Sequence, residues 1–164
     1  MAVESEPGQG ATFRILLPAA TKVAPLPVAA VPARSTPLVG RRVLVMDDEP
    51  AVRDVMAAVL LRSGAEVTTT PGGDAAVAAF VAARDEKRAY DVVILDLTIP
   101  GEHGGREVMA RLHAIDPEVR GVATSGYSDD PVMARPEDFG FSVSLRKPHT
   151  RKELEAALEK ALVP

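Results

Sequence analysis

The sequence contains no cysteine and no tryptophan, and only four phenylalanines and two tyrosines among its 164 residues. Without cysteine, a disulfide-bonded scaffold and thiol chemistry are excluded, which agrees with a cytoplasmic protein. No apolar run approaches the roughly 20 residues that a membrane-spanning helix needs. The net charge of −4 gives no indication of binding to nucleic acid or to a membrane surface.

What is present suffices for one packed domain with an N-terminal extension. Hydrophobic residues make up 46% of the chain, and alanine and valine dominate among them. Residues 19–40 hold four prolines, at positions 25, 27, 32 and 37. Proline at this density disfavours both helices and central strands, so we expect an extended linker over 19–40.

From Arg41 onward, strand-like and helix-like segments alternate five times. The expected strands span 43–46, 65–69, 92–95, 119–124 and 141–145. Helices are expected over about 50–62, 74–84 and 105–115 and after a capping box that begins at Thr150. The stretch 128–140 is interrupted by two prolines, so any helix there should be short. The alternation predicts a doubly wound α/β domain with a parallel sheet over residues 41–164.

Polar residues follow the ends of four expected strands. The third strand is a run of four apolar residues that ends at a carboxylate, Asp96. Asp47 and Asp48 follow the first strand, Ser125 ends the fourth, and Lys147 follows the fifth. The carboxyl ends of parallel strands lie at one edge of the sheet, where open α/β sheets bind ligands. We therefore expect these side chains to meet.

Together these side chains are suited to phosphoryl chemistry, although a lone aspartate after a strand is usually a turn or cap residue. Clustered carboxylates repel one another, and a divalent cation such as Mg²⁺, which prefers oxygen ligands, relieves the repulsion. Lys147 supplies a positive charge for a phosphate, and Ser125 supplies a hydroxyl donor. The set predicts that the Asp96 carboxylate attacks phosphorus and forms an acyl phosphate.

Two other functions use related folds or chemistry. A phosphatase or phosphotransferase of the haloacid dehalogenase type would carry a second aspartate two residues after the nucleophile, where this chain has Thr98. A flavodoxin-like module would bind a flavin, but the acidic pocket would repel the phosphate of that cofactor. Both remain alternatives to a phosphoacceptor domain, and the sequence favours neither.

Residues 41–164 resemble the receiver domain of two-component response regulators. The matching motifs are Asp47-Asp48, Asp96-Leu97-Thr98-Ile99-Pro100 with Gly104, Ser125-Gly126-Tyr127, and Lys147-Pro148. The resemblance implies a flavodoxin-like (β/α)5 fold with strand order 2-1-3-4-5. It also implies that Asp96 is the phosphoacceptor, and that the carboxylates of Asp47, Asp48 and Asp96 with the Thr98 carbonyl hold Mg²⁺. Ser125 would then follow the phosphoryl group, and Lys147 would form a salt bridge with it.

The chain departs from this family at positions that carry the signal. Three residues before Lys147, where the family often has a rotating tyrosine or phenylalanine, this chain has Ser144, and Tyr127 is the candidate substitute. The positions that tune dephosphorylation are Thr98 and Tyr127, and neither is an acid or amide that would position a water molecule. We therefore expect a long-lived phosphoryl group.

Residues 1–18 resemble the last hairpin of the ATP-binding domain of sensor histidine kinases. The resemblance lies in residues 4–13 and in Leu17-Pro18, and an arbitrary tail is the alternative. We expect a kinase remnant over 1–18 and a receiver at the C-terminal end of a hybrid kinase. Expected partners are a histidine kinase, in cis or in trans, or a histidine phosphotransfer protein; a weak homodimer is compatible. The chain itself would catalyse only self-phosphorylation and autodephosphorylation at Asp96.

Overall fold

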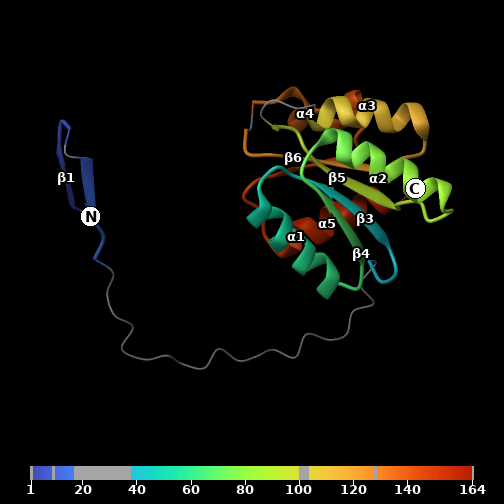
Figure 1. Cartoon of the computed structure of the whole chain (residues 1–164), viewed down its shortest axis with the longest axis horizontal. Coiled ribbons are helices and arrows are strands. Elements are labelled where there is room, and N and C mark those ends of the chain that lie inside the picture. The colour runs from blue at the N-terminus through green and yellow to red at the C-terminus, as the bar shows by residue number, and fades with distance from the viewer. Residues whose placement is uncertain (1, 9, 17–37, 100–103, 128, 164) are drawn as a thin grey trace. The chain divides into compact units, whose positions relative to one another are not determined.

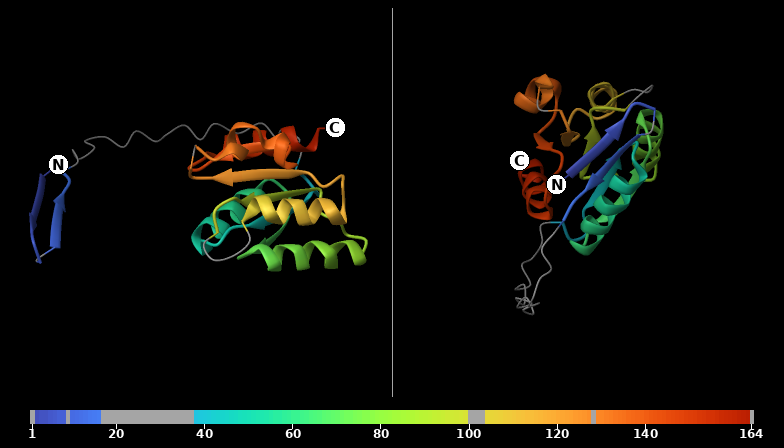
Figure 2. Two further views of the ribbon diagram at one scale, coloured as in Figure 1. Left: turned by 90° about the horizontal axis from the view of Figure 1, so that it is seen from above. Right: turned by 90° about the vertical axis from the view of Figure 1, so that its left-hand side faces the viewer.

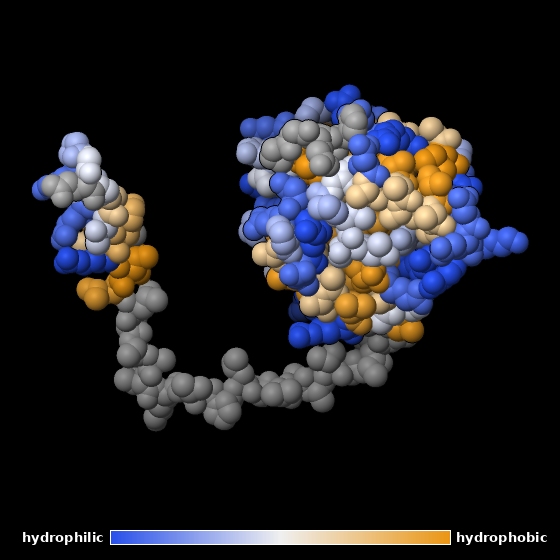
Figure 3. Space-filling model, viewed as in Figure 1, coloured by the Kyte–Doolittle hydropathy of each residue, from blue (hydrophilic) through white to orange (hydrophobic). Residues whose placement is uncertain are grey.

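The computed structural model of this chain describes residues 2–8, 10–16, 38–99, 104–127 and 129–163. The chain divides into two units. The first contains a two-stranded antiparallel hairpin of β1 (Ala2–Glu6) and β2 (Gly10–Arg14), with every strand residue exposed (Figure 1). Since Val3 pairs directly with Phe13, these two side chains share one face of the hairpin. Figure 3 shows apolar residues gathered along one side of this hairpin.

The second unit is built on a five-stranded parallel sheet. Its strands are β3 (Arg42–Met46), β4 (Glu66–Thr70), β5 (Val92–Asp96), β6 (Gly121–Ser125) and β7 (Val143–Arg146). Their order across the sheet is β4-β3-β5-β6-β7, and every neighbouring pair is parallel. Counted within this unit, the order is 2-1-3-4-5, so the predicted fold and topology are confirmed.

Helices cover both faces of the sheet, as Figure 2 shows. The helical segments are α1 (Pro50–Arg62), α2 (Gly73–Asp85), α3 (Gly105–Ile115), the single turn α4 (Pro131–Ala134), the 3₁₀ turn η1 (Pro136–Phe139) and α5 (Arg151–Leu162). α1 and α5 pack on one face, and α2 and α3 on the other. None of the helices in the described part of the chain combines the length and apolar character needed to cross a bilayer.

The sheet separates two hydrophobic layers. Because successive side chains of a strand point to opposite faces, Val43 and Val45 join the layer under α1 and α5. Leu44 and Met46 join the layer under α2 and α3. Burial of each such side chain contributes roughly 1.5–3 kcal/mol, which explains why the central strands read as unbroken apolar runs.

The domain begins earlier than the sequence indicated. Leu38, which we expected to lie in the linker, is fully buried in the layer under α1 and α5. Its carbonyl accepts a hydrogen bond from the Arg41 amide at 3.0 Å, and the Gly40 amide donates to the Gly64 carbonyl at 2.9 Å. Leu38 therefore belongs to the packed unit, because this leucine fills the core and the turn after it is hydrogen-bonded to Gly64, just after α1.

The last strand and the short helical region also differ in detail from the expectation. Phe141 is buried, but its amide donates to the Pro136 carbonyl, so β7 begins two residues later at Val143. Proline starts both α4 and η1, at Pro131 and Pro136, which explains why this stretch forms two single turns. The expected brevity of the 128–140 helix is confirmed for the residues described there.

Candidate functional site

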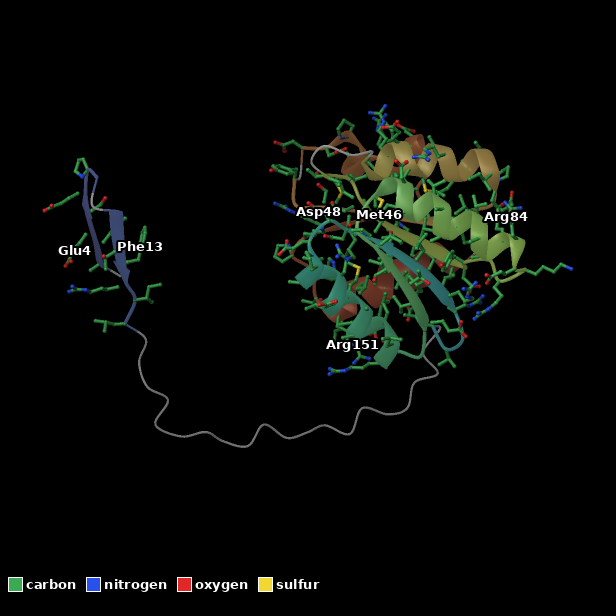
Figure 4. All side chains as sticks on the ribbon, viewed as in Figure 1. Glu4, Phe13, Met46, Asp48, Arg84 and Arg151 are labelled. Carbon is green, nitrogen blue, oxygen red and sulfur yellow. The ribbon has the colours of Figure 1, made fainter. Side chains whose placement is uncertain are left out.

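Four strand ends bring the predicted polar residues to one edge of the sheet. Asp96 ends β5 and Ser125 ends β6, whereas Asp47 and Lys147 each follow the last residue of a strand. Asp48 directly follows Asp47 in the chain, and Figure 4 shows it beyond Met46 at the carboxyl end of β3. Because all five strands are parallel, these ends coincide, as the sequence led us to expect.

The three aspartates form a compact oxygen cluster. Asp47, Asp48 and Asp96 each offer a carboxylate oxygen, and these oxygens lie within 4.8 Å of one another. Asp47 is 1% exposed and Asp96 is 5% exposed, whereas Asp48 faces solvent. Two buried carboxylates beside one open to water suit a hard divalent cation that keeps part of its hydration shell, so the donor set fits Mg²⁺.

Lys147 connects two of these carboxylates. Its ammonium lies 2.5 Å from Oδ2 of Asp47 and 2.7 Å from Oδ2 of Asp96. Lys147 follows β7, so its side chain crosses β6 to reach carboxylates that belong to β5 and β3. A lysine that is only 21% exposed needs such partners, because an unpaired buried ammonium would be strongly destabilising.

Burial and pairing shift the ionisation of this pair. Burial raises the pKa of Asp96 above its ordinary value, although the hydrogen bond and the charge of Lys147 oppose the increase. For Lys147, burial alone would lower the pKa, but hydrogen bonds to Asp47 and Asp96 outweigh it and raise the pKa. The lysine therefore stays charged beside the carboxylate that is to react.

The backbone around Asp47 is fixed by a residue that sequence analysis did not select. Arg53 of α1 donates a hydrogen bond from Nη1 to the Asp47 carbonyl at 2.6 Å. The Glu49 amide donates to Oδ1 of Asp47 at 3.0 Å, which leaves Oδ2 to Lys147. The half-buried Arg53 lies next to Val52, on the inward side of an apolar helix, and this position was the available signal.

Four further residues were predicted to act at this site: Ser125 as the hydroxyl that follows the phosphoryl group, Thr98 through its carbonyl and in tuning, and Tyr127 and Ser144 in signalling or tuning. The Thr98 amide donates to Oδ1 of Asp96 at 3.2 Å, and the Thr98 side chain is exposed. Ser125 is fully buried, and its Oγ accepts a hydrogen bond from the Tyr127 amide at 3.0 Å. The Tyr127 side chain is 68% exposed. Ser144 lies away from the cluster, and its Oγ donates to the Met133 carbonyl of α4 at 2.9 Å.

A groove between α1 and α5 opens next to the cluster. It has a volume of about 650 Å³, and Lys147 lines both the groove and the acidic site. Its walls are mainly apolar, with exposed Val55 on one side and His149 on the other. The lining comprises Glu49, Ala51, Val52, Val55, Met56, Val59, Gly126, Lys147, Pro148, His149, Arg151 and Leu154.

Comparison with known proteins identifies the family. Residues 43–159 match the profile of the response regulator receiver domain. The DNA-binding transcriptional regulator NtrC of Azospirillum brasilense is 32% identical over 120 residues, which cover 73% of this chain and 24% of NtrC. Sensor kinase CckA of Brucella abortus is 31% identical in an alignment that covers 97% of this chain and 17% of CckA. The chain thus spans no more than about a quarter of either relative.

Solved structures agree with this match. A response regulator receiver domain protein from Clostridium thermocellum superposes with a TM-score of 0.62 at 27% identity, covering 74% of this chain and 94% of that one. The response regulator TrrA from Thermotoga maritima, crystallised in complex with Mg²⁺ and BeF, gives 0.64 at 26% identity, covering 74% and 99%. The chain therefore belongs to the response regulator receiver domain family and has the phosphoacceptor fold of two-component signalling.

Proposed function

We propose that Asp96 is the phosphoacceptor of this receiver and that it takes its phosphoryl group from a phosphohistidine. The observation that carries the proposal is the ammonium of Lys147 held between Asp96 and Asp47, with Asp48 beside them. This arrangement gives one carboxylate a fixed position and places a cation where a phosphoryl oxygen would acquire charge. Phosphoryl transfer depends mainly on such positioning and neutralisation.

The proposed step is a simple displacement at phosphorus. A carboxylate oxygen of Asp96 forms a bond to phosphorus while the bond from phosphorus to the histidine nitrogen breaks, and the electron pair of that bond returns to the imidazole. Lys147 neutralises charge on a phosphoryl oxygen, and the Ser125 hydroxyl donates to another. The Thr98 amide, which donates to Oδ1 of Asp96, holds the carboxylate in orientation.

We propose Mg²⁺ as the ion of the acidic cluster. Asp47, Asp48 and Asp96 would hold it, and the carbonyl of Thr98 is the further ligand that the family resemblance implies. When bound, the ion would supply a positive charge to both the attacking carboxylate and the phosphoryl oxygens. Lys147 cannot do this alone, because one ammonium cannot balance the charges of three clustered carboxylates.

The groove between α1 and α5 is our proposed docking surface for the phosphodonor. It is apolar, it opens beside Asp96, and Lys147 forms part of its lining. A helix that carries the phosphohistidine could bury its apolar face there while its imidazole reaches the acidic cluster. The donor would be a sensor histidine kinase, in cis or in trans, or a histidine phosphotransfer protein.

We propose that the chain comes from the end of a hybrid sensor kinase, with a kinase remnant over 1–18, a linker, and the receiver. The match to sensor kinase CckA supports this, because it covers 97% of the chain and so extends beyond the receiver. The hairpin supports it as well, since two strands with Val3 and Phe13 exposed are marginal by themselves. Removal of residues 1–37 should leave phosphorylation of Asp96 unchanged. A truncated protein that is no longer phosphorylated would contradict these boundaries.

Phosphorylation by a small donor tests the proposal for Asp96. Wild type incubated with acetyl phosphate and Mg²⁺ should gain one phosphoryl group by intact mass, and should gain none in excess EDTA. Asp96→Asn should gain none under any condition, whereas Asp85→Asn, a substitution of an exposed aspartate at the end of α2, should behave as wild type. Metal-dependent modification that persists in Asp96→Asn would refute the assignment.

A further inference from the structure

Thr124 is a buried hydroxyl without a hydrogen-bond partner in the part of the chain that the structure describes. The residue is 1% exposed, and its Oγ1 forms no hydrogen bond there. The other buried threonine of the sheet, Thr70, donates from Oγ1 to the Val45 carbonyl at 3.3 Å. A buried hydroxyl left unpaired destabilises the folded state, so one that lies next to a functional site requires an explanation.

The position of Thr124 in the sheet puts it next to Asp96, one member of the acidic cluster. It pairs in register with Asp96 on one side and with Leu145 on the other. Paired residues of neighbouring strands point to the same face, and two residues earlier Ile94 and Val122 both lie in the layer under α1 and α5. Thr124 therefore shares the face of Asp96.

Lys147 lies across that same face. Its side chain starts beyond β7 and ends at Asp96 on β5, and β6 is the strand between them. On this face, the last position of β6 beneath the crossing lysine is occupied by Thr124. Thr124, whose hydroxyl has no donor among the described residues, is thus the cross-strand neighbour of Asp96, the carboxylate that the Lys147 ammonium contacts with one of its three donors.

Once a cation or phosphoryl group occupies the acidic cluster, the Lys147 ammonium needs a hydrogen-bond acceptor and the Thr124 hydroxyl can supply one. Two of the Lys147 donors go to Asp47 and Asp96. These are the carboxylates that would bind a cation or, for Asp96, become part of an acyl phosphate. An ammonium that loses such an acceptor in a mostly buried position must find another. Oγ1 of Thr124 is a buried acceptor with spare capacity on this face.

We propose that Thr124 is a positioning residue for Lys147, whose ammonium donates to Oγ1 of Thr124 when the acidic cluster is loaded. The hydroxyl keeps the Lys147 ammonium directed at the phosphoryl group after the hydrogen bond from Lys147 to Asp47 or Asp96 weakens. This role rests on the proposed function of Asp96, and it assigns to Thr124 a part in the loaded state that it does not have in the resting state.

The resting state offers a readout apart from activity. Without Mg²⁺, Thr124→Val should melt no lower than wild type, because it removes a hydroxyl that has no partner and keeps the shape of the side chain. Thr70→Val is the matched control and should melt lower, because it removes a hydroxyl that donates to Val45. A Thr124→Val protein that melts as low as Thr70→Val, or that fails to fold, would overturn the proposal.

The loaded state supplies the second readout. With saturating Mg²⁺ and acetyl phosphate, Thr124→Val should be phosphorylated about three- to tenfold more slowly than wild type, the effect of losing one hydrogen bond to a charged group. Thr124→Ser, which keeps the hydroxyl, should restore the rate to within about twofold. Equal rates for wild type and Thr124→Val, or a serine variant as slow as the valine variant, would overturn the role of Thr124 alone. No label on wild type would overturn the phosphoacceptor proposal as well.

Discussion

The Nζ atom of Lys147 lies 2.7 Å from Oδ2 of Asp96, so a side chain from the end of β7 passes over β6 to pair with β5. The same ammonium pairs with Asp47 at 2.5 Å. Three strands are therefore connected through one buried cation at the edge where phosphoryl transfer is proposed. The pairing that stabilises the resting domain is also the pairing that the reaction must rearrange.

Lys147→Met should destabilise the domain most at neutral pH. Loss of the ammonium leaves Asp47 and Asp96 buried and unpaired, at a cost of about 2 kcal/mol at pH 7. It also raises the pKa of Asp96 further, because the opposing effect of the lysine is gone. A carboxyl group whose pKa is raised by folding stabilises the fold at low pH and loses this contribution as the pH rises through that pKa. Urea unfolding at pH 5 and pH 7 should therefore show a larger deficit at pH 7.

A deficit that is the same at both pH values would contradict this account of Lys147→Met. Lys152→Met is a suitable control, since Lys152 is exposed at the start of α5 and should change little at either pH.

Ser144→Ala should loosen α4 from the sheet. The Ser144 hydroxyl donates to the Met133 carbonyl at 2.9 Å, and α4 is a single turn that gains little stability of its own. Loss of this hydrogen bond should cost about 1 kcal/mol of unfolding free energy. Amide hydrogen exchange should accelerate at residues 132–135, and Ser142→Ala, at an exposed neighbouring position, should leave it unchanged. Unaltered exchange in Ser144→Ala would show that α4 does not depend on this contact.

His149 should make the stability of the domain depend on pH in the weakly acidic range. Burial first and then the charge of Lys147 lower the pKa of His149, against the attraction of Glu153. The unfolded state, with a pKa near 6.5, therefore binds its proton before the folded state does. The free energy of unfolding should fall as the pH drops below about 6.5, and the fall should continue down to the folded pKa.

Two measurements check this expectation for His149. An NMR titration should give a pKa for His149 below that of a histidine in an unfolded peptide. The difference in unfolding free energy between wild type and His149→Asn should change between pH 7.5 and pH 5.5, and a constant difference would contradict the account.

The phosphoryl group on Asp96 should last for minutes. The family resemblance implies that Thr98 and Tyr127 occupy the two positions that tune its hydrolysis, and neither carries an acid or amide to orient an attacking water. Radiolabelled protein freed of donor should lose its label over minutes in Mg²⁺, and Thr98→Asn should shorten the half-life. Turnover of the label within about a second would contradict this reading.

Much of the fold and of the site could be predicted because it depends on local sequence patterns, namely apolar runs and the polar residues that follow them. Four strands end at or just before Asp47, Asp96, Ser125 and Lys147, and parallel pairing alone brings such ends together. Leu38 was missed because it follows a proline-rich stretch, and only the tertiary core reveals its burial. Arg53 was missed because its position beside Val52 indicates only that it is half-buried, whereas its partner, the Asp47 carbonyl, is determined by the fold.

Thr124 was overlooked for a different reason. Threonine is an ordinary strand residue, and nothing in the sequence tells whether its hydroxyl has a partner. Its significance depends on two properties of the folded sheet. At 1% exposure its hydroxyl has no hydrogen-bond partner among the described residues, and the register aligns it with Asp96.

Chemical trapping of the phosphorylated residue tests the central claim most directly. An acyl phosphate is reduced by borohydride to an alcohol, which would convert a phosphorylated aspartate to homoserine. After incubation with acetyl phosphate and Mg²⁺ and reduction, peptide mass spectrometry should find homoserine at position 96 and at no other aspartate. Homoserine at Asp47, Asp48 or elsewhere, with position 96 unchanged, would contradict the assignment of Asp96 as the phosphoacceptor.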